Sequence, residues 1–163
     1  MIRNPIPWPN GAKCAVALTL DMDADSLIHI SRPNDSFTRL YPISMGRYGP
    51  KVAIPRILNT YRRYNLKQSF FIPGWCLETY PDTVEAILMD GHEIGHHGYL
   101  HEDPVKTAGQ QRVLFERTLE LHKRVCGSKP RGYRAPIYNV TPEVIDLMIE
   151  YGLRYDSSMM ADD

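Results

Sequence analysis

The stretch CAVALTLDMD, residues 14–23, is a continuous apolar run that ends in two aspartates. Runs of this kind are typical of strands that are buried on both faces, as in parallel sheets. Residues 24–49, which follow it, have the composition of a long polar loop, and we expect such a loop to be functional or mobile. Beyond it we predict further strands at 69–73, 92–97, 130–136 and 153–159, and helices at 51–64, 81–91, 107–125 and 142–152.

The alternation of strands and helices predicts parallel βαβ units, and therefore either a parallel barrel or a doubly wound sheet. In both folds, chemistry gathers at the carboxyl ends of the strands. Polar residues do follow these predicted strand ends, and the candidates are Asp21, Asp23, His96, His97 and Arg134.

The chain of 163 residues is electrically balanced, with 19 Lys and Arg against 19 Asp and Glu. A neutral chain has no broad basic field, which argues against nucleic acid as a partner. No apolar run approaches the roughly 20 residues that span a bilayer, and the start lacks the apolar segment of a secretory signal. We therefore expect one domain over 1–163, no membrane partner, a cytoplasmic location, and buried reduced thiols at Cys14, Cys76 and Cys126.

Asp21 and Asp23 are two residues apart on a predicted strand, so their carboxylates face the same side of the sheet. Two carboxylates on one face repel each other, and a cation beside them would compensate. If a divalent ion binds Asp23, Asp21 is free to accept a proton from the metal-bound water, whose pKa the ion lowers. Arg134 would then pair with Asp21 and keep it ionised. The alternatives are aspartates that only stabilise turns or helix starts, and an arginine in a purely structural ion pair.

His97 and His101 are four residues apart, a spacing that lets two imidazoles converge on one ion if the chain turns between them. With Asp23 they would form a set of two histidines and one carboxylate that leaves open positions for water. Strand alternation predicts that only one of His96 and His97 faces this shared site, and His97 has the partner four residues on. The alternative is a group of histidines that make ordinary hydrogen bonds.

Five segments, distributed over nearly the whole chain, carry a resemblance to a known family. They are TLDMDAD at 19–25, FFIPG at 70–74, GHEIGHHGYLH at 91–101, GYRAP at 132–136 and YDSS at 155–158. In order and spacing they resemble the polysaccharide deacetylases, carbohydrate esterase family 4, whose domain is also called the nodulation-type deacetylase domain. The resemblance implies an α/β fold, a distorted parallel (β/α) barrel with fewer than eight strands, and removal of N-acetyl groups from an aminosugar or glycan.

The resemblance also implies roles for individual residues. Asp23, His97 and His101 match the family's metal ligands, and zinc is the expected ion, with Fe, Co and Mn as alternatives. Asp21 matches the catalytic base. The family's other roles match Arg134, which orients that base, and the backbone N–H of Ile137, which donates to the oxyanion. Together they imply a metal-dependent hydrolase of non-peptide C–N amide bonds.

This sequence departs from the family's common pattern at three places. Met22 separates the two aspartates, His96 stands in place of the usual Asn, and Ile137 stands in place of an aromatic residue. The segments SMGRYGP at 44–50 and GHHGYLHE at 95–102 resemble an intracellular branch of peptidoglycan-deacetylase-like and cyclic-imide-hydrolase-like proteins. By that resemblance Arg47 and Tyr48 are candidates for substrate binding, with a surface turn as the alternative. Trp75 is a candidate to flank the mouth of the site, with packing under the loop as the alternative, and Tyr99 is a further candidate for substrate binding.

The sequence is compatible with three functions. The first is N-deacetylation of an aminosugar or glycan, and the second is ring opening of a small cyclic imide or ureide, as in allantoinase-like enzymes. The third is an inactive, truncated binding domain. Family members continue beyond the YDSS strand and supply a late histidine as the general acid, so we expect a barrel that is incomplete at its C-terminus and weak turnover. Self-association could cover the unpaired strand edge of such a barrel, so a homo-oligomer is a further expectation.

Overall fold

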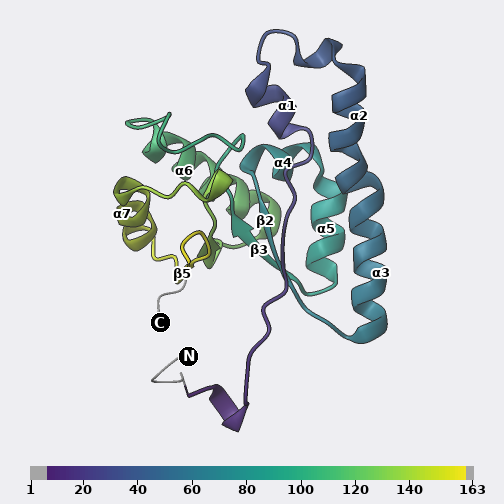
Figure 1. Cartoon of the computed structure of the whole chain (residues 1–163), viewed down its shortest axis with the longest axis vertical. Helices are drawn as coiled ribbons and strands as arrows, with labels where there is room; N and C mark the ends of the chain where they lie inside the picture. The colour runs from purple at the N-terminus through teal and green to yellow at the C-terminus, as the bar shows by residue number, and fades with distance from the viewer. Residues whose placement is uncertain (1–6, 161–163) are drawn as a thin grey trace.

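The computed structural model describes residues 7–160 and contains one five-stranded sheet in which neighbouring strands run parallel (Figure 1). The strands follow one another across the sheet in the order in which they occur in the chain. The register pairs Thr19 with Ser69, Phe70 with Ile94, and His96 with Tyr133. The strands are β1 (Thr19–Asp21), β2 (Ser69–Ile72), β3 (Glu93–His96), β4 (Gly132–Tyr133) and β5 (Tyr155–Asp156).

The sequential strand order decides between the two architectures that the sequence left open. In a doubly wound sheet the order of the strands across the sheet reverses at a switch point, whereas in a barrel each strand lies beside the previous one. The order β1-β2-β3-β4-β5 is that of a barrel, and the predicted (β/α) barrel class is confirmed. The described part of the chain contributes five strands of such a barrel. The predicted domain of 1–163 includes six residues at the start and three at the end that lie outside the described residues.

Helices cover the outer face of the sheet. In Figure 1, α2 and α3 form one long column beside α5 on the right of the view, while α6 and α7 lie on the left. A π-helical segment, Gly49–Ala53, joins α2 to α3, and another, His122–Cys126, extends α6. The helices are α1 (Ser26–Ser31), α2 (Leu40–Tyr48), α3 (Ile54–Tyr64), α4 (Gly74–Thr79), α5 (Pro81–Met89), α6 (Gln111–Leu121) and α7 (Pro142–Glu150).

Several predicted boundaries are wrong. Residues 24–49 are not a loop but contain α1 and α2, which have little apolar periodicity because much of their surface faces solvent. Only Thr19–Asp21 of the predicted strand 14–23 is paired, because β1 has a single neighbour in the described sheet; residues 14–17 are exposed. The predicted helix at 107–125 begins four residues late, at Gln111, and α4 was not predicted.

Two apolar clusters hold the helices to the sheet. One surrounds Met22, Phe70 and Ile72, and the other surrounds Phe115 and Tyr133. Met22 is 3% exposed and belongs to the first cluster, so the flanking Asp21 and Asp23 face the opposite side. Met22, which separates the two aspartates, is therefore a core residue. The alternation of inward and outward side chains predicted for this strand continues past the end of β1.

Within residues 7–160, no helix combines the length and apolar character needed to cross a membrane. The three cysteines are free thiols, as predicted, but they are not uniformly buried. Cys76 is fully buried, Cys126 is half-buried, and Cys14 is exposed, because it lies in the unpaired segment before β1.

Candidate metal centre

The carboxyl ends of β1 and β3 bring the predicted ligands together. Asp21 ends β1, Asp23 follows two residues later, and His97 comes directly after β3. His101 lies in the loop beyond, where its own backbone has a φ of 62°. The left-handed region is costly for a residue other than Gly, and here it turns the His101 ring back toward His97, with the ring centroids 5.1 Å apart.

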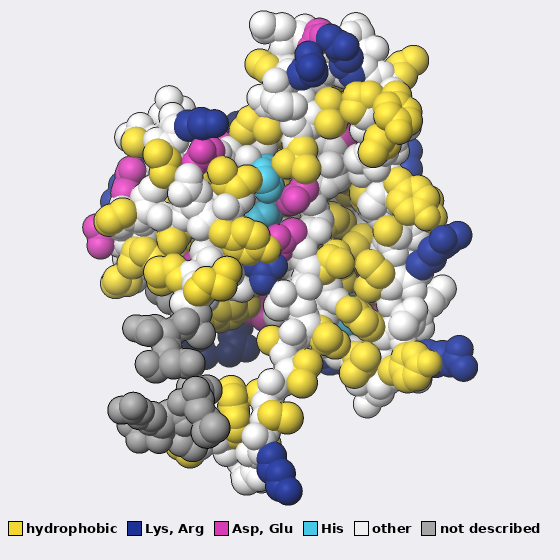
Figure 2. Space-filling model, viewed as in Figure 1, with side chains coloured by type: hydrophobic (Ala, Val, Ile, Leu, Met, Phe, Trp, Pro, Cys, Tyr) yellow, Lys and Arg dark blue, Asp and Glu magenta, His cyan; other side chains and the backbone are white. Residues whose placement is uncertain are grey.

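Asp23, His97 and His101 each direct one ligand atom at a common point. Nε2 of His97 lies 3.3 Å from Oδ1 of Asp23, and Nε2 of His101 lies 3.6 Å from Oδ2. The three ligand atoms of this set lie within 4.8 Å of one another. Figure 2 shows histidine and acidic side chains gathered near the middle of one face of the molecule.

The cluster fits a divalent ion better than it fits a hydrogen-bonded network. Oδ1 of Asp23 and Nε2 of His97 are buried and have no hydrogen-bond partner, which is costly unless something else satisfies them. In tetrahedral zinc sites, bonds of about 2.0–2.1 Å place neighbouring ligand atoms about 3.3 Å apart, close to the separations seen here. Two imidazoles and one carboxylate also suit Fe, Co or Mn.

The tautomer of His97 is set by a main-chain contact. Its Nδ1–H donates to the carbonyl oxygen of Arg134 over 2.7 Å, and a carbonyl can only accept. Nε2 is therefore the unprotonated nitrogen, with its lone pair directed at Asp23. Burial lowers the pKa of His101 below its usual value, while the Asp23 carboxylate partly offsets this effect. This lowered pKa favours the neutral imidazole of His101, the state that ligation requires.

Glu102 supports the loop that carries His101, and sequence reasoning did not single it out. Its carboxylate is buried and accepts backbone N–H groups from Tyr99, at 2.9 and 3.1 Å, and from Leu100, at 2.6 Å. A Cβ on Gly98 would lie 3.0 Å from this carboxylate, and Gly98 has a φ of 68°. Because Glu102 binds main-chain groups, no side-chain spacing in the sequence could have identified it.

Arg134 holds the predicted base in place. Its Nη1 donates to Oδ1 of Asp21 over 2.5 Å, and its Nη2 donates to the hydroxyls of Thr19, at 2.9 Å, and Ser157, at 2.8 Å. The guanidinium also stacks over the Phe71 ring, with Cζ 4.2 Å from the ring centroid. The other oxygen of Asp21, Oδ2, lies 4.0 Å from Nε2 of His97, on the side of the metal cluster.

The turn after β4 has an unusual backbone. Ile137 and Tyr138 both have positive φ, 51° and 59°, which is an outlier for a β-branched residue. The Tyr138 N–H donates to the carbonyl oxygen of Ala135 over 2.9 Å, which leaves the Ile137 N–H as the candidate anion donor of this turn. The turn lies against the metal loop, because a Cβ on Gly98 would lie 3.0 Å from the Pro136 ring. The role of the Ile137 N–H stays a prediction.

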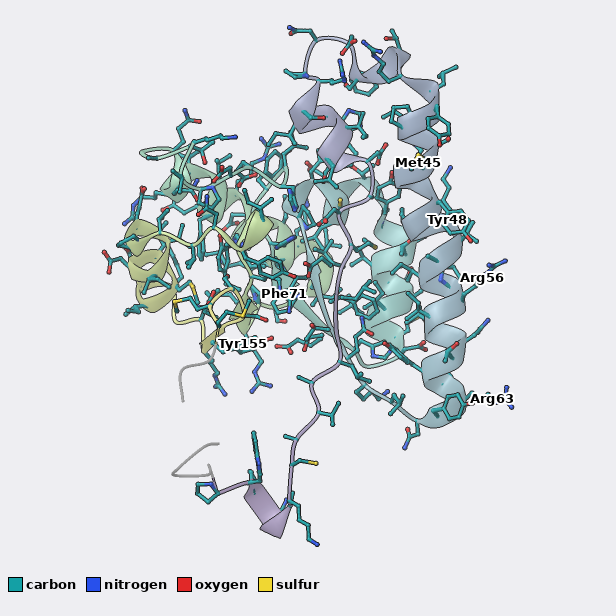
Figure 3. The ribbon with its side chains drawn as sticks, in the orientation of Figure 1. Met45, Tyr48, Arg56, Arg63, Phe71 and Tyr155 are labelled. Atoms are coloured by element: carbon teal, nitrogen blue, oxygen red, sulfur yellow. The ribbon has the colours of Figure 1, made fainter. Side chains whose placement is uncertain are left out.

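The four predicted substrate-binding residues do not form one group. Tyr48 points outward from α2 (Figure 3), and its hydroxyl accepts from Arg56 over 3.3 Å. Tyr99 lies under the Arg117 guanidinium and donates to Glu78; burial and Glu78 raise the pKa of Tyr99 to about 12. Among the contacts of residues 7–160, none joins the side chain of either tyrosine to the metal cluster.

Arg47 and Trp75 have partners in the same buried region. Nε of Arg47 donates to Oδ2 of Asp25 over 3.0 Å, so this edge of the guanidinium is already occupied. The Trp75 ring packs 4.9 Å from the His29 ring and 6.2 Å from the Tyr80 ring. This packing gives Trp75 a purely structural role, as in the alternative considered for it. Substrate binding by Arg47 or Trp75 stays a prediction.

His96 faces away from the cluster, as strand alternation predicted. It is buried and stacks on Phe115, with ring centroids 4.3 Å apart. Its Nδ1 accepts from the Gly98 N–H over 3.2 Å, so Nε2–H donates to the carbonyl of Phe115. Burial lowers its pKa far below the usual value and keeps the ring neutral. His96 is therefore a core residue that ties β3 to α6.

Comparisons with known proteins agree with this geometry. The sequence profile of the family "Polysaccharide deacetylase" matches residues 48–155. A peptidoglycan deacetylase of Helicobacter pylori is 37% identical over 122 residues, which is 74% of this chain and 42% of that protein. The chain thus spans less than half the length of this curated relative.

Solved structures share the fold. A Mycobacterium smegmatis protein assigned as a polysaccharide deacetylase superposes with a TM-score of 0.90 at 38% identity, over 96% of this chain and 55% of that one. An allantoinase superposes with a TM-score of 0.79 over 99% of this chain and 59% of that one, but at 20% identity it shows the fold alone. The fold, the matched profile and the relatives together show that the chain belongs to the polysaccharide deacetylase family.

Proposed function

We propose that this chain carries the metal-binding half of an N-deacetylase that removes acetyl groups from an aminosugar or glycan. The observation that carries the proposal is the convergence of Asp23, His97 and His101 beside the Asp21–Arg134 pair. The H. pylori relative is a peptidoglycan deacetylase, which supports an amide of an aminosugar polymer as the substrate class.

The ligand set would hold a divalent ion, and we propose zinc. When bound, such an ion supplies Lewis acidity, which polarises a carbonyl oxygen and lowers the pKa of water. The chain's own residues prepare the site for it. The Arg134 carbonyl fixes the donor nitrogen of His97, and Glu102 holds the loop of His101.

Asp21 is positioned to act as the general base. The guanidinium of Arg134 donates to Oδ1, which fixes the orientation of the carboxylate. Oδ2 then faces the cluster and can accept a proton from an attacking water. The backbone N–H of Ile137 would donate to the oxygen that becomes negative as the acetyl carbonyl is attacked. A cytoplasmic location and a single catalytic domain over 1–163 remain part of the proposal.

The test is a comparison of two reactions with the zinc-loaded chain. Acetate release from N-acetylglucosamine oligomers and ring opening of succinimide are measured for the wild type, for Asp21→Asn, and for the exposed control Asp82→Asn. Acetate release that falls at least about 100-fold in Asp21→Asn alone supports the proposal, since positioned bases contribute about 10²–10⁴-fold. Ring opening without acetate release would instead favour the cyclic-imide alternative, and zinc binding with neither reaction would favour the binding-domain alternative.

A further inference from the structure

The metal ligand Asp23 is followed by a buried carboxylate that has no part in the predicted catalytic roles. Asp25 is fully buried, and its carboxylate accepts from Nε of Arg47, at 3.0 Å, and from the hydroxyl of Tyr80. Nε2 of His29 lies 3.5 Å away. An ionised carboxylate without water is costly unless several donors satisfy it, so these contacts hold Asp25 in one position.

The backbone between the two aspartates is constrained. Ala24 has a φ of 50°, a conformation that a residue with a Cβ adopts only when its surroundings impose it. Helix α2 packs directly on this turn, because a Cβ on Gly46 would lie 2.7 Å from Cα of Asp25 and 2.9 Å from the carbonyl oxygen of Ala24. Only a glycine at 46 permits this approach.

The main-chain carbonyl of Asp23 accepts two hydrogen bonds, which fix the backbone at this residue. Its carbonyl accepts the backbone N–H of Ser26 over 3.1 Å and the thiol of Cys76 over 3.2 Å. Cys76 belongs to α4, and Tyr80 directly follows that helix. The turn 23–25 is thus held from one side by α2 and from the other by α4.

We propose that Arg47 and Tyr80 are positioning residues that act through Asp25 to fix the metal ligand Asp23. We call Asp25, Arg47 and Tyr80, with Gly46 packed on them, the Asp25 clamp. Asp25 is two residues from the ligand, and the strained Ala24 transmits any movement of Asp25 to the Asp23 carboxylate. This proposal rests on the proposed metal site and gives Arg47 a role other than substrate binding.

The experiment measures zinc affinity by competition with a chelating dye in the wild type, Arg47→Met and Tyr80→Phe. Arg39→Met is the matched control, because Arg39 lies at the start of the same helix and pairs with Asp35 on the exposed surface. We expect Arg47→Met to weaken zinc binding about 10–100-fold, as changes beside metal ligands typically do, and Arg39→Met to leave it unchanged. Tyr80→Phe should have a smaller effect in the same direction.

A double variant separates positioning from simple destabilisation. Arg47→Met leaves Asp25 buried without its cation, whereas Asp25→Asn combined with Arg47→Met removes both charges and should recover stability. The clamp predicts that zinc affinity stays low in the double variant, because the turn is still released. Hydrogen exchange of the metal-free protein over 22–31 should also be faster than in the Arg39→Met control. If Arg47→Met does not fold, the double variant and Tyr80→Phe carry the test.

Two results would overturn the clamp. One is wild-type zinc affinity in folded Arg47→Met, and the other is full recovery of affinity in the double variant together with wild-type hydrogen exchange. Failure of the metal site has a different signature. Wild-type chain that binds no zinc, or binding that survives His97→Ala, would remove the site itself and the clamp with it.

Discussion

Nδ1 of His97 lies 2.7 Å from the main-chain carbonyl of Arg134, so the residue that holds the predicted base also orients a predicted metal ligand. The side chain of Arg134 reaches Asp21, while its backbone reaches His97. The proposed base and the metal cluster are therefore coupled through one residue of β4's carboxyl end. Changes to the Arg134 side chain and changes to His97 should have separable effects.

Replacing His97 should abolish zinc binding. His97→Ala removes a ligand atom, and the loss should exceed the roughly 10–100-fold typical of changes to outer-shell partners. Metal content after dialysis, measured by elemental analysis, is the readout. His92→Gln is the control, because His92 precedes the same strand but lies outside the cluster and accepts from the Gln68 N–H. Unchanged zinc content in His97→Ala would contradict the ligand assignment.

Replacing the Arg134 side chain should destabilise the fold but spare the metal. Arg134→Met leaves Asp21 without its cation and frees two hydroxyls, so we expect the free energy of unfolding to fall by about 3 kcal/mol. His97 contacts only the Arg134 backbone, so zinc affinity should change little. Urea unfolding and zinc titration give the two readouts. The exposed pair of Arg39 with Asp35 supplies the control, in which Arg39→Met should cost about 1 kcal/mol or less. Lost zinc binding in folded Arg134→Met would show that the two functions are not separable.

Glu102 should matter to zinc binding although it is no ligand. Glu102→Gln weakens the acceptor of three backbone N–H contacts, and we expect a loss of about 2 kcal/mol in stability and about tenfold in zinc affinity. The neighbouring Asp103→Asn is the control, because Asp103 accepts from Val105 and Asn139 on the far side of the loop. Calorimetry with and without zinc measures both effects. Equal zinc affinity in the two variants would contradict the support we assign to Glu102.

Stability of the metal-free chain should decline in acid because of two buried histidines. Burial lowers the pKa of His122 to about 3, and it lowers that of His96 well below 6.5. Below about pH 6.5 the unfolded chain binds protons that the folded chain does not, so stability rises with pH through this window and is lost as pH falls. Each histidine contributes up to about 1.4 kcal/mol per pH unit.

His122→Gln tests this origin of the acid sensitivity. The variant removes one of the two groups, so the slope of unfolding free energy against pH between about pH 6 and 4 should fall by about one proton. His92→Gln again serves as the comparison, since the His92 pKa is lowered by a less complete burial. An unchanged slope in His122→Gln would show that other groups cause the acid sensitivity.

Much of the fold was predictable because local patterns match the environment. The buried strands β2 and β3, the helices α3, α5 and α7, and their parallel order follow from apolar periodicity and Gly and Pro positions. Helices α1 and α2 were missed because their inner faces are small and their exposed faces carry Tyr41 and Met45, which give no amphipathic signal. The edge strand was predicted too long, because an apolar run does not reveal how many neighbours a strand has.

The sequence by itself determined which residues are candidate ligands, their order and the face on which each lies, because strand alternation and the spacing of His97 and His101 are local properties. It also determined the family, through the resemblance that the comparisons then confirmed. Only the tertiary structure decided which nitrogen of His97 faces Asp23, that Glu102 accepts the main-chain N–H groups before His101, and that Arg47 turns toward the buried Asp25. These are contacts with main-chain groups or between distant helices, and their geometry exists only once the strands and helices have packed.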